Sequence, residues 1–183
     1  MVDWENPREI SFYNLNGTSI ANSFQIELNY EPIKKLDTRI AYKFFDVSTD
    51  YKSGNLSKPL QPKHRFFINS SYETQKNSKD GYWRFDTTYN LVGKQRLPST
   101  TNNPMIYQLK KYSNSFSTVN TQITKVFNDY FEVYAGGENI TNYKQPNPII
   151  ASNQPFSAYF DSTIVYAPIF GANYYAGLRF NMN

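Results

Sequence analysis

The chain alternates large apolar residues with small or polar ones in a two-residue period over several stretches. In residues 20–30, IANSFQIELNY, every even position except Asn22 is large and apolar, and every odd position is small or polar. This period is typical of a β-strand with two unlike faces. The apolar face would point into the core of a soluble protein, but toward lipid in an outer-membrane barrel.

Six further stretches repeat this pattern, and one partial strand is expected around Ile10–Leu15. The six stretches cover residues 36–46, 65–73, 82–92, 116–127, 130–141 and 172–182. Most have the length of about 10 residues that a tilted membrane strand needs. No helical period competes with them, so the sequence predicts an all-β, antiparallel fold of about eight strands.

Short and long connections alternate between the predicted strands. The short ones lie at 31–35, 77–81 and 128–129, and the long ones at 47–63, 93–111 and 144–171. Tight turns at one end and long loops at the other are typical of an outer-membrane barrel. The polar face carries charges of both signs, such as Glu27 and Arg39. These charges suit a solvated lumen, but they also suit the outside of a soluble sheet.

Composition narrows the class of protein further. Aromatic residues make up 17% of the 183 residues, which fits the aromatic girdles of a barrel and also a sugar-binding sandwich. No window approaches the roughly 18 consecutive apolar residues of a transmembrane helix. The chain has no cysteine and a net charge of +4. Its basic residues are scattered, which argues against a nucleic-acid partner.

The sequence offers no catalytic constellation. The single histidine, His64, has no nucleophile elbow around it. Glu132 and Glu138 share a face but lie six residues apart, about 20 Å along a strand, which is too far for a glycosidase pair. We therefore expect no enzyme activity, no metal site and no cofactor.

Several motifs resemble those of TonB-dependent outer-membrane receptors. FEVYAGGENITNYKQPNPI (131–149) resembles their penultimate strand, and NYYAGLRFNMN (173–183) resembles their closing strand. Upstream, DTRIAYKFFDV (37–47) and KPLQPKHRFFINSSYE (58–73) resemble a recurrent strand, loop and Pro-x-His-Arg pattern of the family. The segment Asn147–Ala151 resembles receptors of the Bacteroidetes group in particular. The resemblance covers essentially the whole chain.

The resemblance implies that residues 1–183 are the C-terminal part of a 22-stranded barrel, about its last eight strands. The plug domain and the N-terminal strands of the family lie upstream of such a segment, and no signal-peptide pattern is present near Met1. The implied function is energised uptake of a scarce nutrient, such as a siderophore-bound metal, cobalamin or a glycan. The implied partners are outer-membrane lipid, the rest of the barrel, the plug, the TonB complex acting through the plug, and the nutrient.

In this interpretation the three long loops capture the ligand outside the cell. The candidate ligand contacts are six loop aromatics: Tyr107, Tyr112, Phe156, Tyr159, Phe160 and Tyr166. The simpler expectation for each is that it packs the loops together. Two other functions remain open. One is a complete eight-stranded outer-membrane barrel with a structural or adhesive role, and the other is a soluble carbohydrate-binding β-sandwich.

Overall fold

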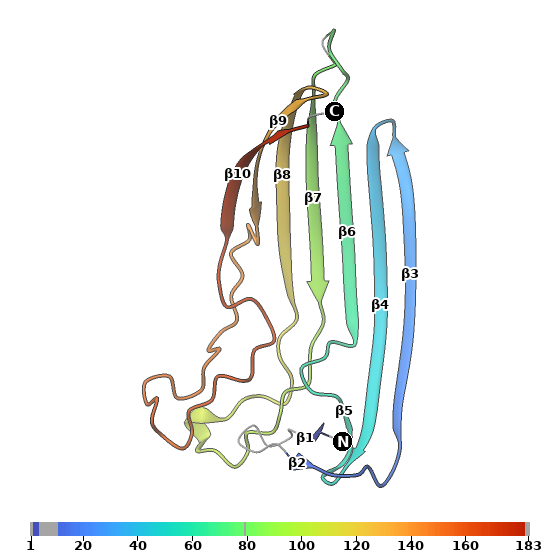
Figure 1. Ribbon diagram of the computed structural model, residues 1–183. Coiled ribbons are helices and arrows are strands. Elements are labelled where there is room, and N and C mark those ends of the chain that lie inside the picture. Colours follow the sequence, from blue (N-terminus) through green and yellow to red (C-terminus); the bar gives the residue numbers. More distant parts are fainter. Residues whose placement is uncertain (1, 4–10, 79, 182–183) are drawn as a thin grey trace.

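A computed structural model describes residues 2–3, 11–78 and 80–181, and its main element is one open antiparallel sheet (Figure 1). Its strands are β3 (Ser19–Ile33), β4 (Leu36–Tyr51), β5 (Gly54–Ser57), β6 (His64–Glu73), β7 (Tyr82–Val92), β8 (Phe116–Asn128), β9 (Phe131–Glu138) and β10 (Asn173–Phe180). They pair in the order β10-β9-β8-β7-β6-β4-β3, with β5 beside β4. The predicted all-β, antiparallel fold of about eight strands is confirmed. The described residues contain one short 3-10 helix, η1 (Met105–Tyr107), and no α-helix.

The short turns gather at one end of the sheet and the long connections at the other, as Figure 1 shows. We call these the turn end and the loop end. At the turn end, residues 34–35 join β3 to β4 and residues 129–130 join β8 to β9. At the loop end, residues 93–115 and 139–172 join β7 to β8 and β9 to β10. The predicted alternation of short and long connections is therefore present.

The expected partial strand near Ile10–Leu15 does not belong to this sheet. Ile10 lies outside the described residues, and β2 (Ser11–Phe12) pairs with β1 (Val2–Asp3) in a separate two-stranded sheet. The eighth strand is β5, which the sequence analysis placed inside a loop. That strand was missed because its four residues, Gly-Asn-Leu-Ser, are too short to display a period.

The β4 strand also runs beyond its predicted end at residue 46, to Tyr51. The predicted loop 47–63 is wrong over its first part, because this stretch pairs with β3 on one side and β5 on the other. Polar side chains pair there, as Ser19 and Thr49 do through their hydroxyl oxygens at 2.7 Å. The apolar alternation stops at this point but the backbone ladder continues, so hydropathy alone cannot place the end of the strand.

The register between strands joins the apolar positions of neighbouring strands into a continuous face, here called the apolar face. One row of directly paired residues is Ile26, Tyr42, Phe66 and Leu91. The next row is Leu28, Ile40, Ile68, Tyr89 and Val119. Since alternate side chains point to opposite sides of a sheet, all of these lie on one side.

The apolar face is not covered by a second layer of the described chain. Ile26 and Leu28 on β3 are 58% and 57% exposed, and Leu178 on β10 is 64% exposed. Extensive contacts between elements join only hydrogen-bonded neighbours. The sheet is thus a single layer, and its apolar side chains are not buried in a hydrophobic core formed with another element.

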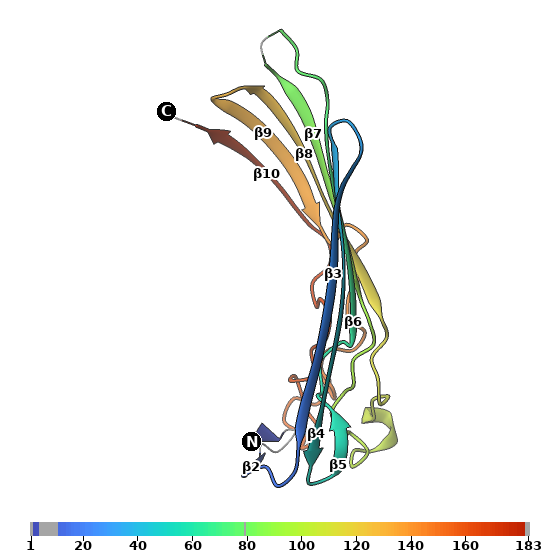
Figure 2. The ribbon, with the colours of Figure 1, turned by 90° about the vertical axis from the view of Figure 1, so that its right-hand side faces the viewer.

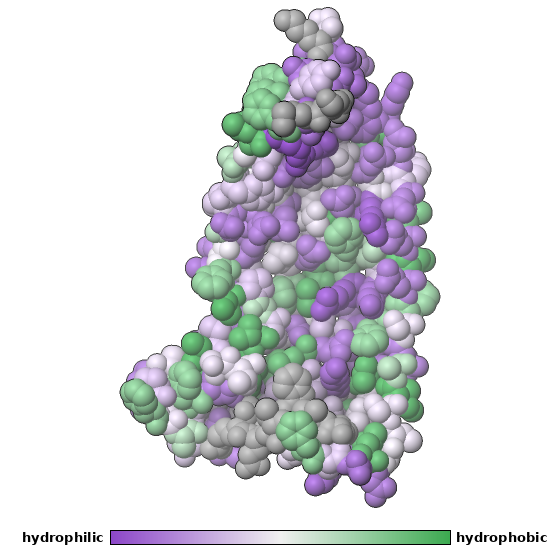
Figure 3. Space-filling view, in the orientation of Figure 1, coloured by the Kyte–Doolittle hydropathy of each residue, from purple (hydrophilic) through white to green (hydrophobic). Residues whose placement is uncertain are grey.

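The opposite face carries a network of polar contacts. Arg39 pairs with Glu27 at 2.8 Å, Ser71 donates to Asp86 at 2.7 Å, and Arg179 pairs with Glu132. Figure 3 shows hydrophilic side chains spread over the strands on this face. Figure 2 shows that β9 and β10 bend at the turn end toward the side that faces the viewer in Figure 1. The polar face is therefore the concave one.

Glycines on β9 and β10 lie beneath tyrosines of the neighbouring strand on the polar face. A Cβ added at Gly136 would meet the Tyr175 hydroxyl oxygen at 2.6 Å and the Thr121 carbonyl oxygen at 2.7 Å. Gly177 is covered by Tyr134 in the same way. The tyrosine rings occupy the space that a side chain would need, and at Gly136 the backbone carbonyl of Thr121 also blocks it, so that position requires glycine.

We predict that Gly136→Ala lowers the free energy of unfolding by about 1–3 kcal/mol, because the Thr121 carbonyl cannot move without breaking the ladder. Chemical denaturation of the purified protein measures this. The matched control is Ala135→Val, since Ala135 is exposed on the apolar face and its added methyl groups meet no such obstacle. Equal stability of Gly136→Ala and the native protein would contradict the packing described.

Candidate functional site

The hydrophobic core of the described residues lies among the long connections at the loop end. Leu97, Ile150, Ala151 and Ile164 are buried together, with exposed fractions between 2% and 6%. Further loop side chains pack against them: Leu60, Tyr107, Leu109, Tyr159 and Tyr166. The connections therefore form one packed cap and not three separate flexible loops.

Gln145 fixes the path of the longest connection. Its side chain is 5% exposed and makes three hydrogen bonds to the backbone about twenty residues further along the chain. Nε2 donates to the Ile164 carbonyl at 2.8 Å, and Oε1 accepts from the Tyr166 and Ala167 amides at 2.7 and 3.1 Å. The buried side-chain amide of Gln145 thus holds two irregular segments together, as backbone hydrogen bonds would hold two paired strands.

Asn139 makes the transition from β9 into the cap. Its backbone is left-handed, with φ of 48°, which asparagine tolerates better than most residues. Its amide donates to Asn120 Oδ1 at 2.9 Å, and its side chain exchanges hydrogen bonds with the Tyr143 backbone at 2.8 and 3.1 Å. Asn139 therefore ends the strand and starts a tight turn.

The two ends of the long connection lie side by side. Asn142 Oδ1 accepts a hydrogen bond from the Ala172 amide at 3.1 Å. A Cβ on Gly171 would overlap that same carboxamide oxygen, so a larger residue there would displace the Asn142 side chain from this contact. The Asn-x-x-Asn spacing of residues 139–142 thus closes a loop of about thirty residues at its base.

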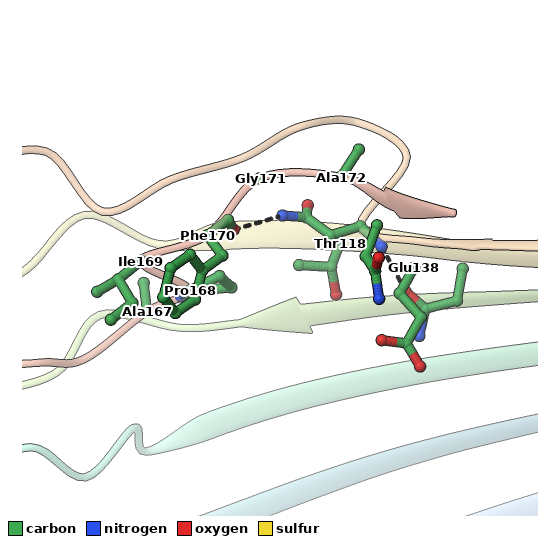
Figure 4. Close-up of a pocket in the computed structure, with 11 residues that line it drawn as sticks. Thr118, Glu138, Ala167, Pro168, Ile169, Phe170, Gly171 and Ala172 are labelled. Carbon is green, nitrogen blue, oxygen red and sulfur yellow. Dashed lines mark hydrogen bonds between the residues drawn. The ribbon is translucent and has the colours of Figure 1, made fainter. Parts of the chain in front are cut away.

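A cavity with a volume of about 960 Å³ opens at this junction. Thr118 and Asn120 on β8, and Glu138 at the end of β9, line one wall; residues 167–173 line the other. Figure 4 shows Phe170 beside Pro168 on the cap side, with the Glu138 carboxylate across the opening. Dashed lines in the figure mark hydrogen bonds of Asn139: its side chain donates to the Phe170 carbonyl across the two walls, and its backbone amide donates to Asn120 on the strand side.

The cavity combines hydrogen-bonding and apolar groups. Thr118, Asn120 and Glu138 have the polar-face parity of their strands and supply hydroxyl, carboxamide and carboxylate oxygens. Ile169 and Phe170 are 45% and 80% exposed and supply an apolar surface. Such a lining can bind a ligand that presents hydroxyl or amino groups on one side and an apolar face on the other.

Three of the six aromatics proposed as ligand contacts pack inside the cap. Tyr107 and Tyr159 stack with ring centroids 5.8 Å apart, and both lie against the buried core with Tyr166. Burial raises the pKa of the Tyr166 hydroxyl. These three contacts match the simpler expectation that loop aromatics hold the loops together.

The other three aromatics are more exposed. Phe156 is fully exposed, while Tyr112 and Phe160 are 47% and 37% exposed. None of the six proposed residues lines this cavity. The sequence alone did not single out Asn139, Asn142 and Gln145 as the residues that shape this end of the molecule. The asparagine spacing was visible, but the partners Phe170 and Ala172 lie some thirty residues away.

His64 sits on the apolar face and not beside a nucleophile. Its Nδ1 is 2.8 Å from the Tyr42 hydroxyl, and its ring lies 5.4 Å from that of Phe44. In the described part of the chain, no three His, Asp or Glu side chains gather in a way that could hold a metal ion. No helix among the described residues is long and apolar enough to cross a membrane.

Comparisons with protein-family models, with curated proteins and with solved structures give no match. The two faces of the sheet and the cap are therefore the features that bear on function.

We predict that Gln145→Leu loosens residues 144–171, because it leaves the Ile164 carbonyl and the Tyr166 and Ala167 amides without their buried partner. Each such group costs about 1–3 kcal/mol. Faster proteolysis and amide exchange in this segment, with unchanged exchange in β6 and β7, is the expected result. Gln154→Leu, at an exposed position of the same segment, is the control. Unchanged exchange in Gln145→Leu would refute this role.

Proposed function

We propose that the chain forms part of the wall and the extracellular cap of a TonB-dependent receptor barrel in the outer membrane. The observation that carries this proposal is the continuous apolar face, exposed on the convex side of a single-layered sheet whose concave side is polar. In a barrel with a water-filled interior, the convex side meets lipid and the concave side meets solvent.

Strand length supports a membrane position. A tilted spanning strand needs about 9–11 residues. The strands β3, β4, β6, β7 and β8 have 15, 16, 10, 11 and 13 residues. In water, an apolar surface of this extent would have to find a partner or aggregate. Lipid supplies the missing cover without a second protein layer.

The open edges favour a larger barrel over a complete eight-stranded one. Among the described residues, β3 and β10 each pair with one neighbour only, and β3 leaves an edge of 15 residues without a second described strand beside it. A complete eight-stranded barrel needs eight spanning strands and a closed ladder, whereas β5 has only four residues. A soluble sandwich would need a second sheet over the apolar face, and the described residues contain none. Adjacent strands of a 22-stranded barrel would pair both edges.

The capture function belongs to the cap and to the cavity beneath it. The cavity opens beside Glu138 on the polar, concave side, where a plug domain and a transported nutrient would lie. Its hydroxyl, amide and carboxylate lining suits a polar nutrient. Under this proposal Phe156, fully exposed on the cap, is the best placed of the six aromatics to meet a ligand first.

We predict that Ile26→Arg blocks assembly into the outer membrane. A guanidinium on the lipid face costs about 2–4 kcal/mol at the bilayer midplane. The measurement is the fraction of the full-length protein that is folded in isolated outer membranes, together with surface protease access to residues 144–171 in intact cells.

The matched control is Glu27→Arg, which introduces the same side chain one position along on the polar face. It removes the ion pair with Arg39, an exposed contact that solvent screens and that contributes little to stability. The proposal expects this variant to assemble. Equal assembly of both variants, or a protein that is fully soluble without detergent, would overturn the membrane assignment.

A further inference from the structure

Aromatic rings gather on the apolar face at the turn end, across β7 to β10. The Phe131 ring stacks on those of Phe127 and Phe180, with ring centroids 5.4 and 4.6 Å apart. Trp83 lies on the same face of β7. Trp83, Phe127 and Phe180 are 43%, 46% and 68% exposed. We call these four residues the turn-end belt.

Lys125 lies within this belt. It pairs directly with Trp83 in the ladder, and its Nζ is 4.9 Å from the centroid of the Trp83 ring and 6.0 Å from that of Phe127. Both distances are typical of a cation beside an aromatic ring. Lys125 forms no ion pair with any residue that the structure describes. Its charge therefore stands on the apolar side of the sheet without a carboxylate from the described chain.

The distance from Lys125 to His64 at the loop end matches the thickness of a membrane. Eight positions separate Trp83 from Leu91 on β7, and Leu91 pairs with Phe66, two positions from His64. These ten positions span about 33 Å along a strand, or about 25 Å across a bilayer for a strand tilted by about 40°. Between the two levels, no charged side chain of β4, β6, β7 or β8 has the parity of the apolar face.

Four hydroxyl side chains cross the middle of this uncharged band, and they bond to one another. The hydroxyl oxygens of Thr38 and Ser70 lie 3.3 Å apart, and those of Thr87 and Thr121 lie 3.4 Å apart. Thr121 also donates to the Asp86 carbonyl at 3.0 Å. Because hydrocarbon offers no hydrogen-bond partner, this pairing lets polar groups remain on a face that meets lipid. The band is thus compatible with lipid over its whole height.

We propose that Lys125 binds the phosphate of an anionic phospholipid, in the leaflet opposite the cap, with the turn-end belt at the level of the headgroups. The inference rests on the proposed membrane position of the apolar face. Aromatic side chains gather where a membrane meets water. A lysine at this level lays its stem along apolar surface and extends its ammonium group to the headgroups. The apolar surroundings of Lys125 favour a lipid as the source of the anion.

The test places the full-length protein in phosphatidylethanolamine vesicles with a trace of photoreactive phosphatidylglycerol. One probe carries the reactive group in the headgroup and the other at the end of an acyl chain, and mass spectrometry maps the labelled peptides. We expect the headgroup probe to label residues 82–85 and 127–131, and the acyl probe to label the middle of the apolar face around Ile68 and Tyr89. Lys125→Gln should lower the headgroup labelling about fivefold, the effect of losing one cation near an anionic headgroup, and leave the acyl labelling unchanged.

Two further variants separate charge from packing. Lys125→Arg keeps the charge and should keep the headgroup labelling. Lys34→Gln removes an exposed charge from the turn between β3 and β4, at the same end of the sheet, and should change neither labelling.

Unchanged headgroup labelling in Lys125→Gln would refute the proposal. A turn-end belt that neither probe labels would refute it too, because another protein surface would then cover the belt. In both cases the proposed membrane position stands as long as the acyl probe labels the apolar face. Absence of acyl labelling anywhere on that face would remove both proposals, so the two can be told apart.

Discussion

The register of the antiparallel ladder is the constraint on which the rest of the structure depends. A slip of one residue between two strands would move a whole set of apolar side chains to the other face. Pairs such as Ile40 with Ile68 and Tyr72 with Phe85 keep the same parity from β4 to β7, and Ala135 with Ala176 keeps it to β10. The division into one apolar and one polar face follows from these pairings.

This division also explains where the buried core lies. Neither face of a single-layered sheet is covered by the described chain, so the strands cannot bury Ile26 or Leu28 against another element. The buried apolar cluster forms instead among the connections, around Leu97, Ile150 and Ile164. Backbone hydrogen bonds between strands hold the sheet together, whereas the cap has a small hydrophobic core of its own. A substitution that breaks strand pairing therefore affects the sheet, and one that opens the small core affects the cap.

The sequence was most informative where the side-chain period is strong. The seven long strands were predictable because apolar side chains fall on one face of each strand and polar side chains on the other over about ten residues. Backbone pairing then aligns these faces from strand to strand. The β5 strand and the outer part of β4 were not predictable, since Ser48, Thr49 and Asp50 pair through the backbone but are polar themselves, so no apolar alternation marks this stretch. The site was harder still. The stacking of Tyr107 on Tyr159 and the bonds of Gln145 join residues far apart in sequence, and no local pattern reports such contacts.

The Asn139 turn brings the cap and the sheet together at one point. Its side chain contacts the Tyr143 and Phe170 carbonyls of the cap, while its backbone amide is held by Asn120 of β8. A ligand in the cavity would touch Glu138 on one wall and residues 167–173 on the other. Binding that requires both walls in place would stabilise this arrangement of cap and sheet by mass action.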